Sequence, residues 1–374
     1  MIKKSVCVLL VLVFVFALAA CSQTPAPASS EAFGSASAST AEAAATAAQE
    51  SASVAASDSA SAANTGSGNY QFALVKGGVN AYFTPMDDAV VKVAQDLGLP
   101  AIIMQSPQEW SQNEQNNILD ALVAQGVGGI ALCTSDPAAG NEEITRIVEA
   151  GVPVVTFAMS PSTPSKATMC LATDVKEAAY QGAKNLIESL GGKGKIVHLT
   201  GNLTDGNTEL RMKGVEAAVS ENPGVEILQT ITDIDDTEKA QNAIDSLLAA
   251  KASEIDGIVC SAYIPSVVLA GRIPNYKDED IKIVGMDTDE AVLNAIKSGD
   301  FAGTMAQNPY GQAYLSICAL KLMADGYTWK DSSQFLVDSG TLFINKDNVA
   351  TYADELTKIT EQLQKDLTDK YFTK

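Results

Sequence analysis

Histidine is almost absent from this chain, whose 374 residues include only His198. A metal site built from several imidazoles is therefore excluded. His198 lies inside the strand-like run from Lys195 to Thr200, where a lone histidine is typical of a structural residue. We therefore expect neither a Ser-His-Asp triad nor a histidine base.

Basic side chains are also scarce, because 25 Lys and Arg residues stand against 45 Asp and Glu residues and the formal net charge is −20. A protein that binds the phosphates of nucleic acid needs clustered positive charge. A broad surface that binds anionic lipid needs the same. The composition thus argues against nucleic acid and against an anionic membrane surface as binding partners.

Closely spaced cysteines are missing as well, since the six cysteines form no Cys-x-x-Cys pair and a metal site is not expected. The segment Gly191-Gly-Lys-Gly-Lys195 precedes a strand-like run and lacks the spacing of a phosphate-binding loop. We predict no cofactor and no metal. The sequence leaves open whether a disulfide joins any two of Cys133, Cys170, Cys260 and Cys318.

The chain begins with two lysines, an apolar run from Val6 to Leu18 and the segment Leu18-Ala-Ala-Cys21. This pattern predicts a signal peptide over residues 1–20, with an apolar run too short for a transmembrane helix. Leu-Ala-Ala-Cys also resembles a bacterial lipobox, in which Cys21 would become the lipidated first residue; a plain signal peptide is the alternative. Residues 21–68 are mostly Ser, Ala, Thr, Pro and Gly, which predicts a disordered tether.

From about residue 69 onward, apolar strand-like runs alternate with amphipathic helical patterns. The alternation starts with Phe72–Val75 and a helix over residues 85–97, and it restarts after Thr173. Repeated βα units of this kind predict parallel sheets with helices on both faces. The expected fold class is α/β, with two Rossmann-like lobes and a ligand cleft between them.

In the stretch from Phe72 to Phe83, an apolar run ends at two glycines and a loop then displays Asn80, Tyr82 and Phe83. Further polar and aromatic residues follow later strand-like runs: Trp110, Asp136, Arg211, Tyr263, Asp287 and Gln307. Taken singly, each has another interpretation, as a helix cap, a surface charge or a core residue. Together, the carboxylates, amides, guanidinium and flat rings predict a cleft that binds the hydroxyl groups and C–H faces of a sugar.

Five short segments, in this order and spacing, carry a family resemblance: Val79-Asn-Ala-Tyr-Phe83, Ser135-Asp136, Arg211-Met-Lys-Gly214, Ile283-Val-Gly-Met-Asp287 and Thr304-Met-Ala-Gln307. From Tyr70 to Asn345 the chain resembles the sugar-binding periplasmic binding proteins of type I, which share the ribose-binding-protein fold. Members of that family serve as lipoprotein receptors of ABC importers. The resemblance implies that these residues contact the ligand: Asn80, Tyr82, Phe83, Asp136, Arg211, Asp287 and Gln307.

The same resemblance implies three hinge crossings, near Thr173, Gln307 and Val337. The N-terminal lobe would then comprise residues 69–173 and 307–336. The C-terminal lobe would comprise these residues: 174–306 and 337–374.

Two departures from the ribose binders change the expected ligand. Where those proteins have an Asp-Arg pair after the fourth strand, this chain has Ala158-Met159. Where they have an Asn-Asp pair, this chain has Ala262-Tyr263. The lost guanidinium and the gained ring predict a ligand other than ribose, with Tyr263 among its contacts. Trp110 joins them because its loop lines the pocket in relatives.

These features predict a monomeric, extracytoplasmic solute-binding lipoprotein that is anchored to the membrane through lipid on Cys21, on a Gram-positive surface or in a periplasm. It would capture a monosaccharide or similar polyhydroxylated molecule by hinge closure and deliver it to an ABC permease. One alternative is a sensory receptor for a sugar-like signal that acts through a chemotaxis or kinase partner. Another is an enzyme that uses Asp136 and Asp287 across the cleft. A repressor is disfavoured because a signal and a tether stand where its DNA-binding motif would lie.

Overall fold

The computed structural model of this protein describes residues 70–374. The predicted signal peptide over residues 1–20, the lipidation at Cys21 and the tether over residues 21–68 lie outside the described residues. Within residues 70–374, no helix is both long enough and apolar enough to cross a membrane. The described chain forms two α/β lobes, each built on a six-stranded sheet.

The first lobe contains a parallel sheet with the strand order β12-β5-β4-β3-β1-β2. Its strands are β1 (Phe72–Val75), β2 (Ile103–Gln105), β3 (Gly129–Leu132), β4 (Val154–Phe157), β5 (Cys170–Ala172) and β12 (Leu336–Asp338). Phe72 and Leu74 enter one hydrophobic cluster, whereas Ala73 and Val75 enter the cluster on the opposite face. Because both faces are covered, β1 is apolar throughout.

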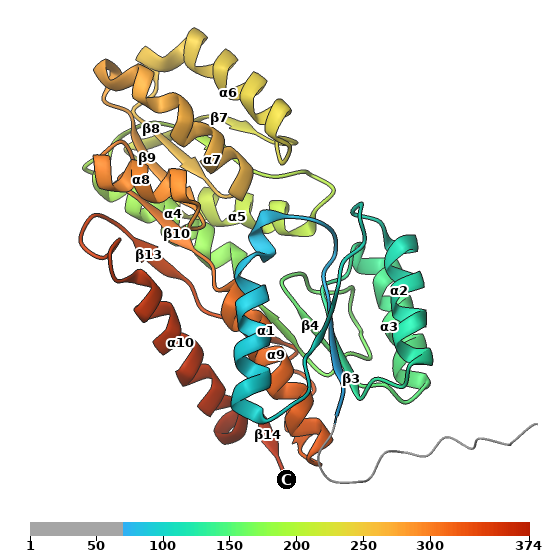
Figure 1. Ribbon diagram of the computed structural model, residues 1–374. Helices are drawn as coiled ribbons and strands as arrows, with labels where there is room; N and C mark the ends of the chain where they lie inside the picture. The colour runs from blue at the N-terminus through green and yellow to red at the C-terminus, as the bar shows by residue number, and fades with distance from the viewer. Residues whose placement is uncertain (1–69) are drawn as a thin grey trace, which may run out of the picture. The chain divides into compact units, whose positions relative to one another are not determined.

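Helices cover both faces of this first sheet (Figure 1). On one face lie α1 (Pro85–Leu97) and α9 (Pro309–Ala324), side by side. On the other lie α2 (Gln112–Ala124) and α3 (Pro137–Glu149). Although α9 follows the second lobe in the sequence, its residue Leu315 is buried in the same cluster as Phe72. The chain therefore returns to complete the first lobe.

The second lobe contains a sheet with the order β13-β10-β9-β8-β6-β7, in which only β13 runs antiparallel to its neighbour. Its strands are β6 (Gly194–Leu199), β7 (Val225–Ile231), β8 (Gly257–Cys260), β9 (Lys282–Met286), β10 (Gly303–Ala306) and β13 (Leu342–Ile344). Position by position, this order matches that of the first sheet, so β9 corresponds to β4. The predicted α/β class with two lobes of mainly parallel strands is confirmed.

The second sheet is also covered on both faces (Figure 1). Its helices are α4 (Val175–Ser189) and α5 (Gly206–Ser220) on one face, and α6 (Thr237–Lys251), α7 (Tyr263–Arg272) and α8 (Glu290–Ser298) on the other. Val197 and Leu199 of β6 face the cluster under α6 and α7, whereas Ile196 faces the cluster under α4. The same two-residue alternation thus organises both lobes.

Three segments connect the lobes, from β5 to α4, from β10 to α9 and from β12 to β13. We expected residues 337–374 to lie wholly in the second lobe, and the structure corrects that boundary twice. Val337 and Asp338 belong to β12, which pairs with β5 in the first sheet. Near the chain end, Leu367 and Phe372 are buried in the first lobe's core, where their apolar side chains leave water.

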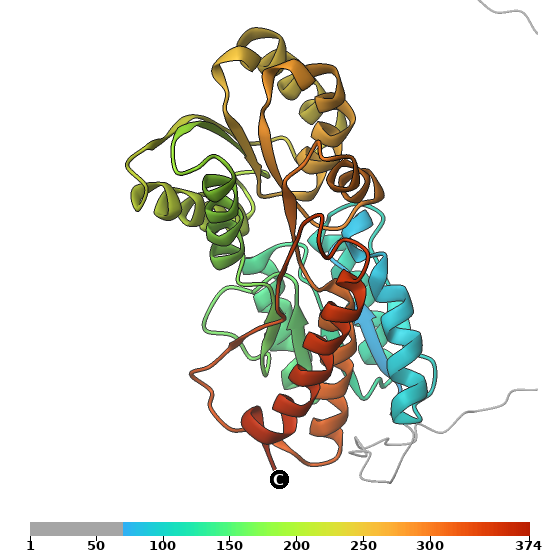
Figure 2. The same cartoon turned by 90° about the vertical axis from the view of Figure 1, so that its left-hand side faces the viewer.

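The helix α10 (Tyr352–Asp366) lies along α9 and reaches both lobes (Figure 2). Tyr352 and Leu356 pack against the hydrophobic core of the second lobe, and Leu363 packs against that of the first. The remaining elements are short: η1 (Ala81–Phe83), η2 (Ala252–Glu254), η3 (Ile273–Glu279), η4 (Leu367–Tyr371), and the antiparallel pair β11 (Thr328–Trp329) and β14 (Phe372–Thr373).

Candidate functional site

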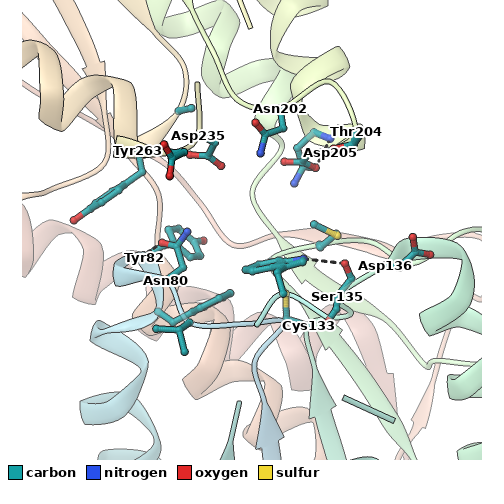
Figure 3. A pocket seen from close by; sticks show the side chains of 18 of the residues that line it. Asn80, Tyr82, Cys133, Ser135, Asp136, Asn202, Thr204, Asp205, Asp235 and Tyr263 are labelled. Carbon is teal, nitrogen blue, oxygen red and sulfur yellow. Dashed lines mark hydrogen bonds between the residues drawn. The ribbon is translucent and has the colours of Figure 1, made fainter. Parts of the chain in front are cut away.

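A cavity of about 670 Å³ opens at the carboxyl ends of the two sheets, with one wall from each lobe (Figure 3). In Figure 3, Asn80 and Tyr82 of the first lobe lie opposite Asp235 and Tyr263 of the second. Every residue that the sequence predicted as a ligand contact lines this cavity: Asn80, Tyr82, Phe83, Trp110, Asp136, Arg211, Tyr263, Asp287 and Gln307. The structure thus brings the predicted set together, and contact with a ligand remains a prediction for each.

The most exposed aromatic ring of the first-lobe wall belongs to Trp110, which is 46% exposed, whereas Tyr82 is half-buried. Its ring lies nearly parallel to that of Phe83, with the centroids 6.0 Å apart and the planes at 16°. Phe83 itself is only 2% exposed, and Tyr82 packs edge-on against it with the centroids 5.4 Å apart. Phe83 is therefore core that supports the indole, whereas Trp110 offers its ring to a ligand.

The two glycines after β1 make this arrangement of Trp110 sterically possible. A Cβ atom added at Gly77 would lie 2.9 Å from Cζ2 of the indole, and one added at Gly78 would lie 2.7 Å from Cε3. Both distances are shorter than van der Waals contact allows. The indole is further fixed because its Nε1 donates a hydrogen bond to the Ser135 carbonyl at 2.8 Å. The absence of a side chain at Gly77 and Gly78 therefore leaves room for the Trp110 indole.

Most polar side chains of the first-lobe wall already have partners within the protein. Asn80 Oδ1 accepts from the backbone of Tyr82 at 2.9 Å, and the Tyr82 hydroxyl donates to Gln312 Oε1 at 2.9 Å. Asp136 caps α3 by accepting from two backbone N–H groups at 2.8 and 2.7 Å. The Ser135 hydroxyl donates to a backbone carbonyl at 2.5 Å. Several side-chain atoms of this wall are therefore engaged within the protein, whereas Asn80 Nδ2 and Asp136 Oδ2 have no hydrogen-bond partner among residues 70–374.

The second-lobe wall has the opposite character, because Arg211 of α5 lies there among carboxylates. Its Nη1 is 4.0 Å from Asp205 Oδ2, and Asp235 and Asp287 line the same part of the cavity. The Arg211 side chain is 11% exposed, and its Nε is buried without a hydrogen-bond partner among residues 70–374. A guanidinium with unused donors next to a cavity is suited to bind ligand oxygen atoms.

Asp287 follows β9 and is the most enclosed carboxylate of this wall, at 6% exposure. Both of its oxygens accept hydrogen bonds from Gln307 Nε2, at 3.0 and 3.2 Å. Burial raises the pKa of the Asp287 carboxyl to about 6, against the opposing effects of the Gln307 hydrogen bond and the Arg211 charge. At neutral pH the group is therefore an ionised acceptor.

Tyr263, at the first turn of α7, is held by a neighbouring carboxylate. Its hydroxyl donates to Asp289 Oδ2 at 2.7 Å, while Asp289 Oδ1 caps α8 by accepting a backbone N–H at 2.8 Å. Burial and the Asp289 carboxylate raise the pKa of Tyr263, so the phenol stays neutral. The ring is thereby fixed at the edge of the cavity.

A buried hydrogen-bond network links the cleft to the connections between the lobes. Gln312 of α9 accepts from the Tyr82 hydroxyl. Its Nε2 donates to Ser339 Oγ at 3.0 Å and more weakly to Thr173 Oγ1 at 3.4 Å. Ser339 and Thr173 lie just beyond β12 and β5, where two of the connections begin.

The third connection joins this network through Asn308, which precedes α9. Its Nδ2 donates to the Ser339 carbonyl and to Thr360 Oγ1 of α10, both at 3.0 Å. Its Oδ1 accepts the backbone N–H of Gly311 at 2.9 Å. All three connections and α10 are therefore joined by buried hydrogen bonds behind the cavity.

Sequence reasoning missed several residues that line the second-lobe wall. Asn202, Thr204 and Asp205 lie in the loop after β6, where a polar composition was the only available signal. Asp235 follows β7, the edge strand, and the cluster of acids from residue 233 to 236 was the available signal. These positions were not distinguishable from solvated loop residues without the second wall in place.

The histidine and the cysteines offer no reactive group. His198 is 1% exposed, and its Nε2 lies 2.7 Å from Ser261 Oγ, while burial and the Arg211 charge lower its pKa to about 3. Cys133 lines the cavity as a free thiol, and burial raises its pKa to about 12. The disulfide that the sequence left open is not formed, because these cysteines are free: Cys133, Cys170, Cys260 and Cys318. Among the described residues, no cluster of His, Cys, Asp or Glu could hold a metal ion.

Comparison with known proteins gives a consistent result. The family profile described as periplasmic binding protein domain matches residues 72–328. The xylitol-binding protein of Mycolicibacterium smegmatis is 26% identical over 259 residues, which are 66% of this chain and 73% of that protein. The D-apiose import binding protein of Paraburkholderia graminis is 22% identical over 258 residues, which are 69% of this chain and 82% of that protein.

Solved structures show the same fold. A solute-binding protein of an ABC transporter from Actinobacillus succinogenes, with bound D-allose, superimposes with a TM-score of 0.70 and 21% identity. The match covers 76% of this chain and 100% of that one. A sugar-binding protein of a sugar ABC transporter from Bacillus halodurans gives a TM-score of 0.69 at 22% identity, over 76% of this chain and 100% of its own.

Proposed function

This chain belongs to the periplasmic binding protein family, and we propose that it captures a monosaccharide or similar polyhydroxylated molecule for delivery to an ABC permease. The observation that carries the proposal is the cavity between the lobes, with an exposed indole on one wall and hydrogen-bonding groups on the other. A flat ring covers the C–H face of a sugar, and charged donors and acceptors bind its hydroxyls. Each hydrogen bond to a charged group contributes roughly 1.5–3 kcal/mol.

Ligand capture would work by closure of the two lobes around the cavity. A ligand that touches both walls when the lobes are closed, and one wall when they are open, stabilises the closed arrangement. The three connections between the lobes are the segments that would bend. The closed form would then be the one that an ABC permease recognises.

The similar proteins support this proposal and give no support to the alternatives. Their names describe binding of xylitol, D-apiose, ribose or galactose, and several name import. None of these names describes a sensor or an enzyme. Chemotactic or kinase signalling and sugar hydrolysis therefore have no observation in their favour.

The location of the protein is part of the same proposal. A signal peptide over residues 1–20 would export the chain, and lipid on Cys21 would hold the monomer at the membrane through the tether over residues 21–68. The supporting observation is the lipobox-like segment Leu18-Ala-Ala-Cys21. The full-length protein should incorporate radiolabelled palmitate, and replacement of Cys21 by Ser should abolish that incorporation. Equal labelling of the variant, or no labelling of the unmodified protein, would contradict lipid anchoring.

Intrinsic fluorescence offers a direct test, because the chain has only two tryptophans and one of them lines the cavity. We expect saturable quenching with a dissociation constant in the micromolar range or below, which is about −8 kcal/mol, for some member of a panel of pentoses, hexoses and polyols. The signal should disappear in Trp110→Phe and persist in Trp329→Phe, since Trp329 instead stacks on Tyr371 with the planes at 9°. Folded protein with no heat of binding for any panel member would overturn the proposal.

A further inference from the structure

The two sheets place corresponding residues on opposite walls of the cavity. Because β4 and β9 occupy the same position in the two strand orders, Ala158 and Asp287, which follow them, correspond. Both line the cavity. Both have left-handed backbone conformations, with φ of 61° and 68°. The backbone conformation is therefore alike at these two positions, but the side chains differ in chemistry.

On the second lobe this position supplies a carboxylate, and on the first it supplies only hydrocarbon and sulfur. Asp287 is an ionised acceptor beside the Arg211 guanidinium, as described above. Ala158 has a methyl group, and Met159 next to it adds a thioether to the cavity lining. A thioether is at most a weak acceptor and cannot donate.

The groups around Ala158 and Met159 do not compensate for this loss. The Tyr82 hydroxyl donates to Gln312 and the Asn80 oxygen accepts a backbone N–H, so of these two side chains only Asn80 Nδ2 is left to bind a ligand, and it can donate but not accept. Asp136 caps α3 through its Oδ1, which accepts two backbone N–H groups. A ligand hydroxyl placed against Ala158 and Met159 would therefore lose its water without gaining a strong partner.

We propose that the ligand presents its hydroxyl groups to the second lobe and a hydrocarbon group, such as the methyl of a deoxy sugar, to Ala158 and Met159. This inference rests on the proposed function and narrows its ligand class. The ring face of the ligand would cover Trp110, and the hydroxylated edge of the ligand would contact Arg211 and Asp287. A polyhydroxylated ligand with a single apolar edge fits both walls. A ligand with hydroxyls on every edge fits only the second-lobe wall.

Calorimetric titration of matched sugar pairs tests this inference in the intact protein. Suitable pairs differ in one hydroxyl: D-fucose and D-galactose, L-rhamnose and L-mannose, 6-deoxy-D-glucose and D-glucose. In at least one pair we expect the deoxy sugar to bind about 10- to 100-fold more tightly, the range over which an apolar pocket rejects an added hydroxyl. Parent sugars that bind as tightly as their deoxy partners in every pair that binds would overturn the inference and leave the proposed function intact. If no member of any pair binds, the inference fails, and the pentoses and polyols of the wider panel then decide the proposed function.

A substitution at the corresponding position should transfer the polar chemistry to the first lobe. In Ala158→Asp, the added carboxylate can accept a hydroxyl, and Asp tolerates a left-handed backbone better than Ala does. We expect the preference for the deoxy sugar to fall at least tenfold relative to the unmodified protein. Ala158→Asn, which has the same size without the charge, should reduce the preference less. An unchanged preference in Ala158→Asp, with an unchanged melting temperature, would contradict the assignment of this wall.

Discussion

The two lobes follow the same strand order, yet the loops at their carboxyl ends differ in kind. In the first lobe those loops present a supported indole, and the Asn80 oxygen and the Tyr82 hydroxyl are hydrogen-bonded within the protein. In the second they present three carboxylates around one guanidinium with unused donors. Topology thus determines where the cavity lies, and the loop residues determine which part of a ligand each lobe can bind.

If the second lobe supplies most of the polar binding energy, the largest effect should follow from Arg211→Ala. The variant loses donors to the ligand and leaves Asp205 and Asp287 without a nearby positive charge, so we expect at least about 100-fold weaker binding. Lys213→Ala is a matched control on the same helix, because Lys213 pairs with Glu209 at an exposed position. Calorimetry with the best ligand of the panel measures both. A loss of affinity below about threefold in Arg211→Ala would contradict the assignment of most of the polar binding energy to the second lobe.

The first-lobe wall should depend on one ring, so Trp110→Ala is expected to weaken binding about 30-fold. Gly78→Ala keeps the ring but displaces it, because the new Cβ would lie 2.7 Å from Cε3 of the indole. We expect a smaller loss of affinity from Gly78→Ala than from Trp110→Ala, measured with the same ligand. If the order is reversed, the loop backbone rather than the indole contacts the ligand.

The pH dependence of binding should come from the second lobe, through Asp287. Its pKa is raised from 3.8 to about 6, so the folded protein binds this proton more tightly than the unfolded chain does. Ligand affinity should therefore fall about tenfold between pH 7 and pH 5, as the acceptor is protonated. The contribution of Asp287 to the free energy of unfolding runs the other way: it destabilises fully above pH 6, and that cost disappears as the pH falls toward 3.8.

Asp287→Asn is the variant that separates these two effects. Affinity measured by calorimetry should become independent of pH between 5 and 7, and the apo variant should gain stability relative to the unmodified protein at pH 7 in chemical denaturation. A variant that keeps the original pH profile would assign the titration to another group of the cavity.

The smallest effect is expected from Tyr82→Phe, which keeps the ring and removes only the hydroxyl that donates to Gln312. If the first lobe binds ligand through rings, affinity should change no more than about fivefold. The melting temperature should fall by a few degrees, because Gln312 Oε1 is left buried without its partner. A loss of affinity as large as that of Arg211→Ala would show that this hydroxyl binds the ligand, contrary to the comparison.

The fold and part of the set of cavity residues were predictable because both depend on local sequence patterns. Apolar runs alternate with helical patterns, and ligand residues in parallel sheets follow the carboxyl ends of strands. Asn80, Arg211 and Asp287 could therefore be named from their places in the chain, and all three line the cavity.

What local patterns could not predict is which ring is exposed. The sequence predicted Tyr82, Phe83 and Trp110 alike as ligand contacts, whereas the structure buries Phe83 and exposes Trp110. The exposure of Trp110 depends on the loop after β3, because the indole donates a hydrogen bond to the Ser135 carbonyl in that loop. Replacement of Phe83 by Ala would cost about 3–5 kcal/mol of stability. Joint replacement of Tyr82 and Phe83 would therefore not isolate a binding effect.

Contacts between distant segments were equally inaccessible. Gln312 lies in the first turn of α9, and nothing in its sequence neighbourhood marks it as the residue that joins Tyr82 to Ser339. The last residues of the chain were assigned to the second lobe by their order, although Phe372 pairs with Trp329 in β11 and is buried in the first. Order along the chain does not determine packing.

The helix α10 has a consequence for affinity that involves no cavity residue. Because it packs on the cores of both lobes and bonds to Asn308 through Thr360, a rotation of one lobe against the other must deform these contacts. The free energy needed to deform the contacts of α10 would then contribute to the equilibrium between the open and closed forms, and so to the fraction of closed molecules. Apparent affinity scales with that fraction. Substitutions on the far side of the molecule could therefore adjust the threshold concentration at which the protein responds, while its choice of ligand stays the same.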